Sequence, residues 1–108
     1  MSVREKTLQN YLVELLKNSR VREFINSKAP NKRASNFQPT LSVVDRVSKG
    51  NPSQYAGMAL GARTIQISQW ICVDKDQAFA TARHELAHCI MNWCSLPGSH
   101  HGLSLIHI

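Results

Sequence analysis

With 108 residues and 12.1 kDa, the chain has the length of one compact domain and is too short for two. Hydrophobic residues make up 43% and charged residues 19%, which favours a folded globular domain and excludes wholesale disorder. The net charge of +6 lies in residues 1–50, which hold ten Lys or Arg and four Asp or Glu. Such a basic half is typical of non-specific contact with DNA, and a solvated helix face is the alternative.

The sequence also bears on compartment and cysteine chemistry. No stretch reaches the ~18 consecutive apolar residues of a membrane span, and the charged start MSVREKTLQN lacks the apolar core of a signal peptide. We therefore expect a cytoplasmic protein without membrane contact. An odd number of cysteines without a CxxC pair argues against a disulfide framework or a zinc ribbon, so we interpret all three as small buried residues: Cys72, Cys89 and Cys94.

The first predicted element is an amphipathic helix near the N-terminus. Apolar side chains recur there at helical spacing, at Leu8, Tyr11, Leu12, Leu15 and Leu16. Val21, Phe24 and Ile25 continue this apolar face to about Ser27. The Pro, Asn and Ser residues that follow predict a loop over 28–39.

Three strands are predicted after that loop. Residues 40–47, TLSVVDRV, are rich in β-branched side chains and precede a cluster of turn residues. Residues 55–59 and 63–68 flank a Leu-Gly-Ala connection, which is typical of a hairpin and places Ile65 and Ile67 on one face. We therefore expect an α+β fold with an N-terminal helix and a small three-stranded antiparallel sheet.

A helix over about 75–94 is the element most clearly marked in the sequence. Asp74 can cap its start with a Gln three residues later, and Ser-Leu-Pro-Gly ends it. Apolar or small side chains share one side: Phe79, Ala82, Leu86, Cys89, Ile90 and Trp93. We therefore expect Trp93 in the core. His84 and His88 lie on another side, one turn apart, so both imidazoles can reach one ion.

Residues His84-Glu85-Leu86-Ala87-His88 form an HExxH motif. In the chemical interpretation of this motif, both histidines ligate Zn²⁺ and Glu85 takes a proton from the water on the metal. A third protein ligand and one open position would make the zinc catalytic. The candidates all follow the helix: His100, His101 and His107. The alternative is a chance string on an ordinary helix, with exposed histidines and Glu85 acting only as a helix former.

This motif, the strands before it and a later His-Gly pair resemble the SprT-like, or Spartan-type, zinc metallopeptidase domain. The matching stretch covers 37–102 and includes QPTLSVVDRV, YAGMA, RTIQIS and ARHELAH. The resemblance implies a minimal zincin-like fold and a zinc-dependent endopeptidase acting on proteins or peptides. In eukaryotic relatives the substrates are proteins crosslinked to DNA. The resemblance further implies the site residues, with Glu85 as general base and His84, His88 and His101 as zinc ligands.

The single domain, 1–108, is thus expected to have three parts: a basic helical part over 1–35, the family-like core over 37–102 and a tail over 103–108. In the SprT-like family an aromatic residue and a further helix follow the His-Gly pair, whereas this sequence continues as LSLIHI. The same six residues are encoded by a transposase end used in sequencing libraries. We therefore expect a non-native tail on a truncated domain, with a short genuine strand as the alternative.

Two functions are compatible with these residues. In the first, three neutral imidazoles hold zinc, which lowers the pKa of its water to about 7, and Glu85 passes the proton to the leaving amine. Tyr55 and His100 are candidates for a second donor to the oxyanion. In the second, His100 closes a structural four-ligand zinc site in a nucleic-acid-binding module, whose residues 1–50 contact DNA.

Overall fold

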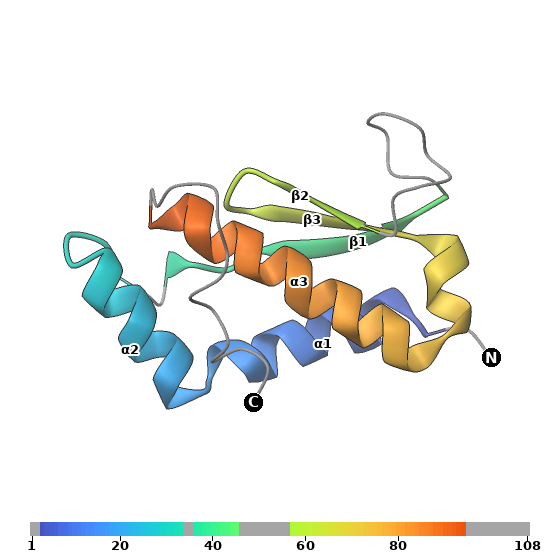
Figure 1. Ribbon diagram of the computed structural model, residues 1–108, viewed down its shortest axis with the longest axis horizontal. Helices are drawn as coiled ribbons and strands as arrows, with labels where there is room; N and C mark the ends of the chain where they lie inside the picture. Colours follow the sequence, from blue (N-terminus) through green and yellow to red (C-terminus); the bar gives the residue numbers. More distant parts are fainter. Residues whose placement is uncertain (1–2, 34–35, 46–56, 95–108) are drawn as a thin grey trace.

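Helices lie against one face of a small three-stranded sheet (Figure 1). The structure, a computed structural model, describes residues 3–33, 36–45 and 57–94. In chain order the elements are α1 (Glu5–Leu16), α2 (Ser19–Lys28), β1 (Thr40–Val44), β2 (Gly57–Leu60), β3 (Thr64–Ser68), the 3-10 helix η3 (Gln69–Val73) and α3 (Lys75–Trp93). The α+β class predicted from the sequence is confirmed. None of the described helices combines the length and hydropathy needed to cross a membrane.

The predicted N-terminal helix is divided in two at Asn18. α1 ends at Leu16 with Lys17 as its C-cap. The Asn18 side chain caps α2 by accepting hydrogen bonds from the backbone N–H groups of Arg20 at 2.9 Å and Val21 at 3.4 Å. Asn favours this position because its short side chain satisfies N–H groups that have no partner within the helix. The apolar face predicted over both halves is buried on each side of the break, through Leu8, Leu12, Val21 and Ile25.

The long helix α3 lies where the sequence predicts it. The Asp74 carboxylate accepts a hydrogen bond from the Gln77 backbone N–H at 3.1 Å, which is the predicted cap. Trp93 at the other end is 9% exposed, and its ring centroid lies 5.4 Å from that of Phe37, so its expected place in the core is confirmed. The predicted burial of the cysteines is also confirmed, with free thiols at Cys72, Cys89 and Cys94.

The sheet is mixed, which corrects the antiparallel sheet predicted from the sequence. β2 and β3 form the expected antiparallel hairpin, with Gly61 in its turn at a φ of 68°, a value that favours glycine. β1, however, pairs with β3 in parallel, and the strand order is β1-β3-β2. β3 occupies the centre because Ile65 and Ile67 are completely buried. Only the hairpin turn specifies a pairing locally, so the partner of β1 is decided by burial.

The outer edge of β1 is covered by side chains of α1. The backbone N–H of Leu41 donates to the Gln9 carboxamide oxygen at 2.7 Å, and that of Val43 donates to the Glu5 carboxylate at 2.8 Å. These bonds occupy main-chain donors that an added strand would need. Of the two edges of the sheet, the edge at β2 is therefore the one that α1 leaves uncovered.

Ile67→Ala should destabilise the fold far more than Leu60→Ala. Ile67 is completely buried in β3, whereas Leu60 at the end of β2 is 41% exposed. Because removal of buried methyl groups leaves a cavity, we expect a loss of about 2–5 kcal/mol for Ile67→Ala and less than about 1 kcal/mol for Leu60→Ala. Urea unfolding followed by circular dichroism measures both losses. Equal losses would contradict the central position of β3.

Candidate metal centre

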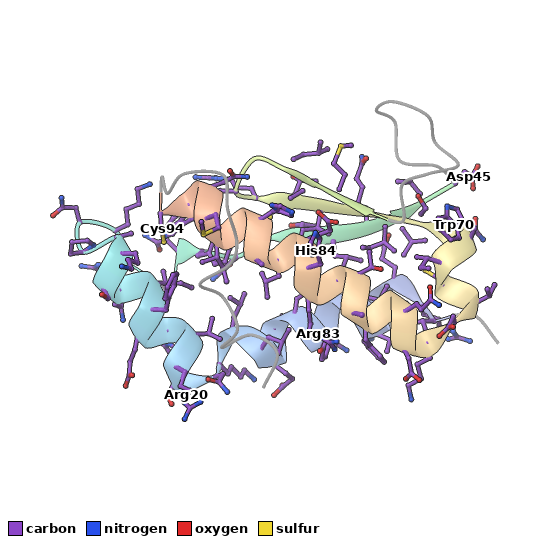
Figure 2. The ribbon with its side chains drawn as sticks, viewed as in Figure 1. Arg20, Asp45, Trp70, Arg83, His84 and Cys94 are labelled. Carbon is purple, nitrogen blue, oxygen red and sulfur yellow. The ribbon has the colours of Figure 1, made fainter. Side chains whose placement is uncertain are left out.

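His84 and His88 point from α3 towards a common point. His84 lies midway along the helix (Figure 2) and is exposed, whereas His88 is half-buried. Their Nε2 atoms are 3.2 Å apart. Residues four apart on a helix are neighbours on its surface, and α3 holds them there because its opposite side is fixed in the core by Leu86 and Ile90. The two ring nitrogens therefore converge as the sequence predicts.

This separation fits a shared zinc ion. Two nitrogens bound at about 2.0–2.1 Å in tetrahedral geometry lie about 3.3 Å apart. The same distance also suits a hydrogen bond between the rings when one Nε2 carries a proton. Among residues 3–33, 36–45 and 57–94, no group of three or more His, Cys, Asp or Glu side chains could hold a metal. The proposed third ligand, His101, and its alternatives His100 and His107 lie outside the described residues, as do Tyr55 and the tail.

Glu85 is buried beside the histidine pair. Its side chain is 8% exposed, and burial raises the pKa of its carboxyl group to about 7, while a hydrogen bond with the backbone of Ala59 acts in the opposite direction. Ala59 belongs to β2, so Glu85 connects α3 to this edge strand of the sheet. A residue serving only as a helix former would be expected at the surface, and a carboxyl group that titrates near neutral pH is suited to proton transfer.

A hollow of about 380 Å³ separates α3 from β2 and contains these groups. Its lining combines three residues of β2 with four of α3: Gly57, Met58, Ala59, His84, Glu85, His88 and Asn92. Of these lining residues, the sequence predicted only His84, Glu85 and His88 as site residues. Because this lining combines β2 with α3, a ligand in the hollow could contact the strand and the histidine pair together.

Asn92 also lines this hollow, although it lies outside the HExxH motif. Its side-chain Nδ2 donates to the Gly61 carbonyl oxygen at 2.8 Å, which ties the hairpin turn to α3. The sequence does hold a signal, because Asn92 follows His88 by the same four residues that separate His88 from His84. This periodicity places all three polar residues on one stripe of the helix, but the partner of Asn92 is evident only in the structure.

Gly57, at the other end of the hollow, allows β2 to approach α3 closely. A Cβ atom there would lie 2.9 Å from the Thr81 methyl group and 3.1 Å from the Gln66 carbonyl oxygen. Real side chains do not tolerate the shorter of these distances, so glycine is the residue that lets β2 pass this close to α3. With Asn92 at the far end, α3 holds β2 at two points on either side of the histidine pair.

On the far side of the same helix, Arg83 contacts α1. Its Nη1 donates to the Tyr11 hydroxyl at 2.8 Å, and the Tyr11 ring packs edge-on against Phe79, with centroids 4.7 Å apart. Figure 2 shows Arg83 pointing from α3 towards α1. Arg83 precedes His84 directly, so this contact helps to fix the rotation of α3 that turns the histidines towards β2.

Comparison of the chain with protein-family models, with curated protein sequences and with solved structures finds no match. A function for the chain is therefore inferred from its own residues and their geometry.

In the metal-free protein, Glu85 should make the fold less stable as the pH rises. Its pKa is about 7 when folded against 4.5 when exposed, so between these values the unfolded chain releases a proton that the folded chain retains. We expect Glu85→Gln to gain stability relative to the wild type across this window, by up to about 3 kcal/mol. Urea unfolding in the presence of a chelator tests this. A difference that is constant from acid to neutral pH would contradict it.

Proposed function

We propose that the protein is a zinc-dependent metalloendopeptidase with a minimal zincin-like arrangement. His84 and His88 supply two ligands, His101 the third, and Glu85 the general base. The observation that supports this best is the pair of Nε2 atoms 3.2 Å apart next to a buried carboxyl group, at a hollow along the edge strand β2. Perturbed carboxyl groups beside converging ligands in a cleft are typical of catalytic sites.

The chain's own residues perform defined tasks in this mechanism. When bound, zinc supplies a Lewis acid that polarises the scissile carbonyl group and makes water a better nucleophile at neutral pH. His84 and His88 bind as neutral imidazoles through Nε2. Glu85 accepts the proton of the attacking water at a carboxylate oxygen and then donates it to the nitrogen of the leaving amine. Its burial keeps bulk water away from the transferred proton.

An extended peptide is the substrate that this site suits. The N–H groups of β1 at Leu41 and Val43 are already bonded to α1, whereas β2 lines the hollow that holds the histidine pair. A peptide added alongside β2 would gain main-chain hydrogen bonds and bring one of its carbonyl groups near Glu85. This mode of binding recognises backbone more than side chains, which supports an endopeptidase acting on protein chains.

Zinc binding is the first test. We expect one zinc ion per chain in the wild type, loss of the ion in His84→Ala and His88→Ala, and strongly weakened binding in His101→Ala, as measured by elemental analysis after dialysis. Affinity should also fall as the pH drops through about 6.5, because imidazole ligands must be deprotonated. His100→Ala is the matched control. Loss of zinc in that variant but not in His101→Ala would move the third ligand by one residue, and full zinc content in both helix variants would reject the site.

Hydrolysis tests the role of Glu85. Glu85→Gln preserves shape but cannot accept a proton, so we expect it to retain zinc and to lose peptide cleavage by roughly 10²-fold or more. The measurement is release of a fluorophore from a quenched unstructured peptide. Activity equal to the wild type would remove Glu85 from the mechanism. A zinc protein that neither binds a hydroxamate nor cleaves any peptide would instead support the structural zinc of a nucleic-acid-binding module.

One detail bears on that alternative. Of the basic residues near the end of α2, Lys32 donates from Nζ to the Trp93 carbonyl oxygen at 2.8 Å and lies 5.0 Å from the centre of the Trp93 ring. Its charge therefore contacts the end of α3. The neighbouring Lys28 and Arg33 are exposed, as a phosphate contact of this kind requires.

A further inference from the structure

A second hollow, of about 450 Å³, lies where α1 ends, α2 begins and residues 37–40 lead into β1. Among the described residues it shares none with the candidate metal centre, whose lining comes from β2 and α3. Its side chains are of two main kinds, apolar and cationic: Val13, Leu16, Phe37 and Pro39 are apolar, and Lys17 and Arg22 are cationic. No Asp or Glu lines it.

The apolar part offers a surface for an aliphatic group. Phe37 is only 3% exposed and Pro39 is buried, so they form the floor, whereas Val13 is 41% exposed and forms part of the wall. Val13 is one of few large hydrophobic side chains exposed among the described residues. An exposed apolar side chain inside a hollow, beside polar groups, is typical of a binding site.

The shape of this hollow is fixed by a side chain. Gln9 in its wall donates from Nε2 to the Pro39 carbonyl oxygen at 3.2 Å and accepts from the Leu41 N–H at 2.7 Å. Both ends of the Gln9 amide are therefore committed, and they hold α1 against the start of β1. A ligand would meet a preformed wall, which lowers the cost of binding.

The cationic part has capacity for an anion. Among the described residues, Lys17 forms an ion pair only with Glu14, at 3.4 Å between exposed side chains, and exposed pairs of this kind are weak. All seven Asp and Glu residues of the chain lie within the described ranges, and none is within ion-pair distance of Arg22. The Arg22 guanidinium group is thus available to bind a carboxylate through two parallel hydrogen bonds.

We propose that this hollow binds an acidic segment of a protein substrate, with an aliphatic side chain against Val13 and Leu16 and a neighbouring carboxylate at Arg22 and Lys17. That the segment belongs to a substrate rests on the proposed peptidase function. We choose a peptide as the occupant because an aliphatic residue next to Asp or Glu matches both the apolar and the cationic part of the hollow. A nucleic-acid backbone offers no aliphatic group for the apolar half and would use the exposed cations outside the hollow equally.

The test measures binding of a short fluorescein-labelled peptide with one Leu between Asp and Glu residues, by fluorescence anisotropy, to the metal-free protein. We expect Arg22→Gln and Lys17→Gln each to weaken binding roughly three- to tenfold, and Val13→Asp to weaken it more. Arg20→Gln removes the same charge from the exposed first turn of α2 (Figure 2), at a residue that does not line the hollow, and should stay within about twofold of the wild type. All four substituted side chains are exposed, so the variants should fold, which circular dichroism verifies.

Control peptides distinguish the site from general charge attraction. Replacing the Leu by Ser should weaken binding about tenfold, because the apolar half then has no occupant. Two results would overturn the proposal: an equal loss of affinity in Arg20→Gln and Arg22→Gln, or single-stranded DNA of the same charge binding as tightly as the peptide. Peptide binding is measured on the metal-free protein, so it is independent of zinc binding. Failure of zinc binding with intact peptide binding would therefore reject the metal centre alone, and the converse would reject this site alone.

Discussion

The packing of α3 against the β2–β3 hairpin is the contact on which the candidate site depends. Leu86 and Ile90 of α3 belong to the same hydrophobic core as the completely buried Ile65 and Ile67 of β3. This shared core sets the distance between helix and sheet. At that distance β2 clears α3 only because Gly57 has no side chain. The histidine pair, the carboxyl group and the strand edge are therefore brought together by one apolar interface.

The burial of Glu85 at the candidate site lowers the stability of the fold. Burial of an ionisable group is unfavourable, and the raised pKa of this carboxyl group is the direct sign of it. Nothing in the packing of α3 requires a carboxyl group there, since Ala78 and Ala82 fill the turns before it on the buried side. A chemical role for Glu85 would explain why a destabilising buried carboxyl group is present at this hollow.

The structure shows where the described basic residues of the first half of the chain lie. Part of the basic excess is used within the fold, since Lys32 binds the end of α3 through the Trp93 carbonyl oxygen. Another part lines the hollow between α1 and α2, next to apolar side chains. The remaining exposed lysines and arginines of the described residues are spread over the start of α1, over α2 and over the turn after it. Basic residues of one chain segment thus serve as a helix contact, as the rim of a hollow and as a solvated surface.

The sequence by itself determined the elements whose signals are local. The helical period and the Asp74 cap define α3, the Leu-Gly-Ala turn defines the hairpin, and the spacing of His84 and His88 makes their rings converge. Only the tertiary structure decided that β1 runs parallel to β3 and that Glu85 is buried against Ala59. The reason is physical: strand order and desolvation depend on residues far apart in the chain, whereas periodicity and capping act within a few residues.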